Sequence, residues 1–94
     1  MSHQITRKFP GKSADEIYAK VDEGMRRLAE KMALDYSSDG EKKAGKVSKM
    51  GVTGAYFVKD GEVTVDLKFP MLVPGSMRQK VAGDIERKLD GLFA

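Results

Sequence analysis

The sequence predicts a small α+β domain in which two helices pack on one face of an antiparallel sheet of about four strands. Three observations predict this class. Two segments place their apolar residues at helical spacing, Asp60-Gly61 separates two β-rich runs, and further apolar residues alternate with polar ones. The expected order is strand, helix, three strands, helix, and the 94 residues are expected to form a single domain, 1–94.

The first two elements are a short strand and a long helix. A strand is expected over 5–9, where apolar and polar side chains alternate, and Pro10-Gly11 ends it. Ser13 and Glu16 form a capping box that begins the helix, and Gly24 in its middle is expected to allow close packing against a strand. The apolar residues of this helix fall within about 80° of arc and predict one buried stripe, formed by Ile17, Val21, Met25, Leu28 and Met32.

The middle of the chain is more polar. Residues 35–43 are expected to form a loop, and 44–50 a weak, polar strand. Gly51 and Gly54 indicate a tight turn or a bulge. Because this segment lacks the Gly-Lys-Ser/Thr ending of a phosphate loop and does not open a helix, its glycines are interpreted as structural.

A β-hairpin is expected from 55–59 and 62–69, because Asp-Gly between β-rich runs favours a two-residue turn. The alternation of the second strand sets the register and places Phe57 on the polar face of the sheet, away from the apolar face. The expected pairs are Lys59 with Glu62, Val58 with Val63, Phe57 with Thr64 and Tyr56 with Val65.

An apolar connection over 69–74 leads to a second helix, for which Ser76 and Gln79 predict a capping box. Two charged residues, Arg78 and Lys88, fall inside the apolar arc of this helix. Either they extend from the margins of the stripe to solvent, or they line a cavity and hold an anionic head group. The apolar stripe itself consists of Met77, Val81, Ile85, Leu89 and Leu92.

Composition argues against several classes of function. The absence of Cys excludes disulfides, thiolate metal sites and a Cys nucleophile, and a single His excludes a multi-His metal site. His3 is expected to be exposed near the terminus, and no spaced pair of carboxylates indicates acid–base catalysis. We therefore expect no catalytic residue, no metal, no cofactor and no enzyme. With no long apolar run and no signal peptide, the expected compartment is the cytoplasm.

Four lysines form the densest basic run of the chain: Lys42, Lys43, Lys46 and Lys49. One interpretation is a patch that contacts nucleic acid or another polyanion. The other is a solvated edge strand, where lysines prevent edge-to-edge pairing. The second is favoured, because 17 basic and 14 acidic side chains leave a net charge of only +3 and no exposed aromatic pair is interleaved with the lysines.

Phe57 on the polar sheet face indicates a contact, most simply with a second copy of the chain in a homodimer, although single exposed apolar residues are common. Met71 and Leu72, in the apolar connection, complete the candidate interaction surface.

The second half of the chain resembles the polyhydroxyalkanoic acid system family, small bacterial proteins of polyester-storage gene regions. The resemblance rests on Gly51-Val52-x-Gly54, Val63-x-Val65-x-Leu67, 69–72 and 85–93, and in the first half on 28–31. This chain lacks the Trp that the family usually has near residues 37–38, and its following strand is richer in lysine.

The resemblance implies a role at polyhydroxyalkanoate granules or in their regulation, without an established activity or catalytic residues to transfer. We therefore expect a non-enzymatic accessory protein that contacts the granule surface. The alternatives are a polyanion- or nucleic-acid-binding module that uses the lysine run, and a carrier of a small ligand or lipid with Arg78 or Lys88 at the head group.

Overall fold

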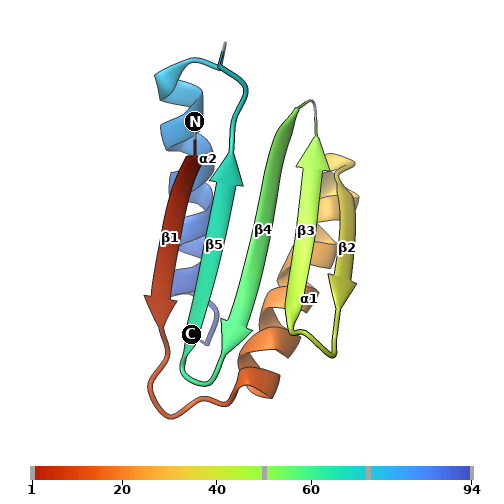
Figure 1. Ribbon diagram of the computed structural model, residues 1–94, viewed down its shortest axis with the longest axis vertical. Coiled ribbons are helices and arrows are strands. Elements are labelled where there is room, and N and C mark those ends of the chain that lie inside the picture. The colour runs from red at the N-terminus through yellow and green to blue at the C-terminus, as the bar shows by residue number, and fades with distance from the viewer. Residues whose placement is uncertain (1, 50, 72, 94) are drawn as a thin grey trace.

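The computed structural model describes residues 2–49, 51–71 and 73–93. It has a five-stranded antiparallel sheet of order β1-β5-β4-β3-β2, with both helices behind the same face (Figure 1). The predicted α+β class is confirmed, and the sheet has one strand more than the approximate four expected. Strand β1 spans Ser2–Lys8 and lies at one edge beside β5, antiparallel to it.

The additional strand is β2, Asp35–Asp39, where the sequence predicted a loop. It forms the second edge of the sheet and pairs with β3, Ala44–Lys49. Its residues are mostly Asp and Ser, which have low strand propensity. This polar composition is the reason that the sequence predicted a loop here. The pairing with β3 and the contact of Tyr36 with the helix layer hold the segment extended.

The predicted hairpin is confirmed with its register. It consists of β4, Val52–Lys59, and β5, Glu62–Lys68, and the Phe57–Thr64 pair is as expected. Gly51 turns the chain into β4 with a φ of 85°. Gly54 lies inside β4, where an added Cβ would be 3.2 Å from Leu67 Cδ2, so it serves close packing rather than a turn.

Helix α1 spans Ala14–Met32 and has the predicted Ser13 cap, with the Glu16 amide donating to Ser13 Oγ. Asp60 of the hairpin turn adds a second cap, because the Ala14 amide donates to its Oδ1 at 2.7 Å. Helix α2 spans Gly75–Asp90 and begins after Pro74 without a side-chain cap, so the predicted capping role of Ser76 is wrong.

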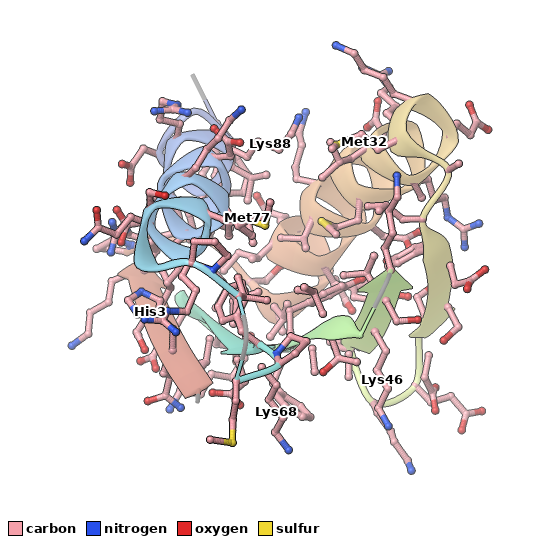
Figure 2. The ribbon with its side chains drawn as sticks, turned by 90° about the horizontal axis from the view of Figure 1, so that it is seen from above. His3, Met32, Lys46, Lys68, Met77 and Lys88 are labelled. Carbon is pink, nitrogen blue, oxygen red and sulfur yellow. The ribbon has the colours of Figure 1, made fainter. Side chains whose placement is uncertain are left out.

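The core lies between the sheet and the helices (Figure 2). Alternate residues of β5 face it, and α1 covers β2 to β5 while α2 covers β1. The predicted helical stripes are buried only in part, because Met32 at the end of α1 and Met77 at the start of α2 are half-exposed. The most buried core side chains are Ile17, Val63 and Leu67.

Candidate functional site

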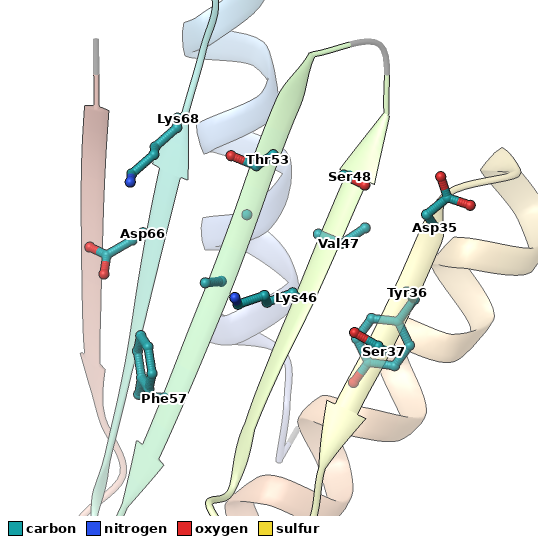
Figure 3. Close-up of a pocket in the computed structure, with 12 residues that line it drawn as sticks. Asp35, Tyr36, Ser37, Lys46, Val47, Ser48, Thr53, Phe57, Asp66 and Lys68 are labelled. Carbon is teal, nitrogen blue, oxygen red and sulfur yellow. The ribbon is translucent and has the colours of Figure 1, made fainter.

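The four lysines of the basic run lie on separate surfaces. Lys42 and Lys43 are in the turn between β2 and β3, and Lys43 Nζ lies 2.9 Å from Asp15 Oδ1, an ion pair that raises the pKa of Lys43. Lys46 projects from the open face of the sheet (Figure 3). Lys49 donates to the Met32 carbonyl oxygen at 2.6 Å. These four lysines therefore do not lie on one face of the sheet.

The open face of the sheet carries a shallow hollow of about 670 Å³. Phe57 of β4 borders it with 54% of its surface exposed, and Lys46 projects from the neighbouring strand (Figure 3). Asp66 and Lys68 approach from β5, and Gln4 donates to Asp66 Oδ1 at 2.9 Å. The hollow thus combines an aromatic ring with charges of both signs.

Three exposed methionines lie at one end of the molecule, where α1 and β5 end and α2 begins (Figure 1). Met71 is 89% exposed, Met77 52% and Met32 49%. We call Met32, Met71 and Met77 the methionine end. Phe57 is separate from it, since its partner Thr64 lies mid-strand in β5, four residues before Lys68. Leu72, the third residue of the predicted interaction surface, lies outside the described residues.

A groove separates α1 from α2 above the centre of the sheet, and its surface is almost wholly apolar. Lys88 borders the groove, as expected if this residue lines a cavity rather than extending from the margin of the apolar stripe to solvent. Arg78 is not a groove residue; its Nη1 donates to the Val73 carbonyl oxygen at 3.3 Å. Gly24 lies in the α1 wall, and an added Cβ would meet nothing within 4 Å, so its predicted role in close packing is wrong.

A half-buried polar network joins α1, β2 and β4, and no pattern in the sequence indicated it. Tyr36 donates to Asp22 Oδ1 at 2.7 Å, and a short hydrogen bond joins the hydroxyls of Tyr36 and Tyr56. Because the one hydroxyl proton of Tyr36 points to Asp22, Tyr56 is the donor of this second bond. Arg26 Nε also donates to Asp22, at 2.9 Å. An added Cβ at Gly45 would lie 2.3 Å from the Tyr56 ring, so only glycine leaves room for it.

The network changes the acidity of its members. Burial raises the pKa of Tyr36 to about 12 and also raises the pKa of Tyr56, which donates to Tyr36. Burial works against ionisation of Asp22, but the hydrogen bonds from Arg26 and Tyr36 outweigh it and lower the pKa of Asp22. The pair of tyrosines therefore stays protonated beside a charged carboxylate, which suits a structural network.

His3 is exposed on β1, opposite Leu67 of β5. Within the described ranges, no group of three or more His, Asp or Glu side chains is arranged to hold a metal ion. Among the same residues, no helix has the length and apolar character needed to cross a membrane.

Comparison with solved structures shows that the fold has a precedent. The chain is similar to the crystal structure of a TBP-like protein from Parabacteroides distasonis, with a TM-score of 0.63 and 12% sequence identity. The match covers 70% of this chain and 52% of that chain, so the chain spans about half of the length of that structure. At this identity, the likeness concerns the fold alone. The comparison with curated proteins gives no match.

Comparison with family models agrees with the resemblance seen in the glycines, the core strand and the closing helix. The family described as "Putative polyhydroxyalkanoic acid system protein" matches residues 4–93, which include every described element apart from the first residues of β1. Its name states a biological setting and no biochemical reaction. The chain belongs to this polyhydroxyalkanoic acid system family.

Proposed function

We propose that the protein is a cytoplasmic, non-enzymatic accessory protein of polyester storage that contacts the surface of polyhydroxyalkanoate granules. Membership of the family supports the setting. The observation that carries the contact is the methionine end, where Met71 is 89% exposed and two further methionines are half-exposed. Methionine is flexible and adapts to irregular apolar surfaces, and full burial of its side chain contributes about 1.5–3 kcal/mol.

Binding, rather than catalysis, fits the way the helix carboxylates are used. Asp22 pairs with Arg26, Glu23 with Arg27, and Asp90 with Arg7 of β1. The first two ion pairs join residues within α1, and the third joins α2 to β1 of the sheet. The alternative function, polyanion binding through the lysine run, has less support because the structure divides that run among separate surfaces.

The test is co-sedimentation of the purified protein with polyhydroxyalkanoate granules across a salt series. We expect saturable binding that persists at high salt, because apolar contacts are not screened. Met71→Ser with Met77→Ser should weaken this binding at least several-fold. Phe57→Ser is the matched control, since it removes an exposed apolar side chain, about as exposed as Met77, from a different surface.

Three results would overturn the proposal: no binding at any salt concentration, binding that disappears as salt rises, or binding lost in Phe57→Ser but kept in the double methionine variant. Circular dichroism of each variant shows whether the fold is intact before its binding is compared.

We also propose that two copies of the chain associate through the open face of the sheet, around Phe57. The support is a half-exposed aromatic ring next to charges of both signs, Lys46 and Asp66, on the face opposite the one that both helices cover. This face is separate from the methionine end, so a dimer would leave the granule contact available.

A further inference from the structure

The open face of the sheet, opposite the helices, carries formal charges that cancel. Val63, Val65 and Leu67 of β5 are buried in the core, so the residues between them face away from it, and paired residues of the other strands lie on the same face. Its lysines are Lys8, Lys46, Lys59 and Lys68, and its carboxylates are Asp35, Asp39, Glu62 and Asp66. Such a face does not attract a polyanion, and it does not repel a second copy of itself.

The aromatic ring of this face stands among small side chains. Phe57 is 54% exposed, and its register partners are Thr64 of β5 and Ala44 of β3. Ala55 lies two residues before it on the same strand and the same face. Small neighbours leave room beside the ring for a second ring. The centre of the face therefore suits an apolar contact with another aromatic side chain.

The strand register places opposite charges on the two sides of β4. Ala55 of β4 pairs with Asp66 on β5 and with Lys46 on β3, so the three residues form one row across the sheet. Each charged residue lies about one strand spacing, about 4.8 Å, from β4. Among the described residues Lys46 has no hydrogen-bond or ion-pair partner, and Asp66 accepts one hydrogen bond, from Gln4. Both side chains can therefore take a partner from another molecule.

This row selects one of two symmetric ways to stack two open faces. A two-fold axis that runs along β4, between the sheets, brings the β5 side of one copy over the β3 side of the other. Asp66 of each copy then faces Lys46 of its partner. A two-fold axis across the strands, along the row, would instead place Asp66 over Asp66 and Lys46 over Lys46. Because like charges that face each other repel, the axis along β4 is favoured.

We propose this arrangement for the dimer proposed above, on which the inference rests. The two β4 strands face each other and run in the same direction, with the two Phe57 rings in contact at the axis and an Asp66–Lys46 ion pair on each side. Stacked sheets lie about 10 Å apart, a gap that the long side chain of Lys46 spans towards the carboxylate. Lys59 also lies near the axis, and its charge is paired with Glu62 of its own chain at 3.6 Å.

The test reverses the charges one at a time and measures the dimer dissociation constant by sedimentation equilibrium. Lys46→Glu and Asp66→Lys should each weaken the dimer at least about tenfold, because each brings two pairs of like charges together. The chain with both substitutions should recover to within about threefold of the unmodified chain. Lys68→Glu is the matched control, with the same charge change on the same face. Because Lys68 lies across the axis from the partner's Ser48, we expect a loss of less than about threefold.

A mixture of the two single variants tests whether the ion pairs form between chains. Lys46→Glu and Asp66→Lys chains should associate with each other, since in the mixed dimer each reversed residue faces an opposite charge. An interaction within one chain does not produce this recovery. Circular dichroism shows whether each variant is folded.

Three results would overturn the arrangement while leaving the dimer: full dimerisation of both single variants, equal losses in Lys46→Glu and Lys68→Glu, or a mixture that stays monomeric. An unmodified chain that is monomeric at every concentration would overturn the dimer itself, so the two failures are distinguishable.

Discussion

Tyr36 shows how much a single residue contributes to this fold without any local signal in the sequence. It lies 14 residues from Asp22 and 20 from Tyr56, and its hydroxyl meets both. No spacing rule connects residues of α1, β2 and β4 that only the tertiary structure brings together. The sequence showed that four lysines are close together along the chain. Closeness along the chain does not place side chains on one surface, because neighbouring residues of a strand face opposite sides of the sheet.

Tyr36→Phe should destabilise the protein by about 1–3 kcal/mol, because Asp22 and Tyr56 each lose a hydrogen-bond partner in a half-buried site. Urea denaturation followed by circular dichroism measures the change. Tyr18→Phe is the control, as no hydrogen bond of its hydroxyl is seen among the described residues, and it should change stability by less than about 0.5 kcal/mol.

The same variant has a signature at alkaline pH. The pKa of Tyr36 rises from 10.0 to about 12 on folding, so the folded state holds the proton more tightly than the unfolded state. The resulting stabilisation is complete below pH 10 and is lost as the pH rises towards 12. Stability should therefore fall more steeply over this range in the unmodified chain than in Tyr36→Phe. Parallel pH profiles of the two proteins would show that Tyr36 has no such role.

At the scale of elements, prediction succeeded where one local signal specifies the geometry. Asp60-Gly61 between alternating runs specified the β4–β5 hairpin and its register. It failed at β2, whose Asp and Ser residues have low strand propensity and which is extended because it pairs with β3. It also failed at the start of α2, where Ser76 has the right spacing from Gln79 but lies inside the helix, since Pro74 precedes the first turn.

The two serines allow a matched test of helix capping. Ser13→Ala should destabilise the protein by about 1 kcal/mol, because the Glu16 amide at the start of α1 loses its acceptor. Ser76→Ala should have almost no effect, since α2 has no side-chain cap. Thermal unfolding of both variants measures the difference. An equal loss in the two variants would contradict the observed cap at Pro74.

At the scale of the whole molecule, the two faces of the sheet have different roles. The helices cover one face of the sheet (Figure 2), while Phe57 lies exposed on the other face (Figure 3). The methionine end lies at a third position, where three elements begin or end. The proposed granule contact and the proposed dimer face are therefore distinct surfaces of one small domain, and each is accessible to a separate substitution.

The remaining prediction is the dimer. The size of the open face shows how much of it a stable interface would need. Five strands about 4.8 Å apart and about seven residues long cover roughly 24 by 23 Å, or about 550 Å² in projection. A stable interface buries about 800 Å² of accessible surface per partner, so most of this face would have to take part, with Phe57 on its central strand. Phe57→Lys places a charge there and should convert a dimer into a monomer without loss of fold, because residue 57 is already 54% exposed. Sedimentation velocity over a range of concentrations measures this directly. Met71→Ser, at the methionine end, should leave the dimer intact, and a chain that is monomeric at every concentration before any substitution would contradict the dimer.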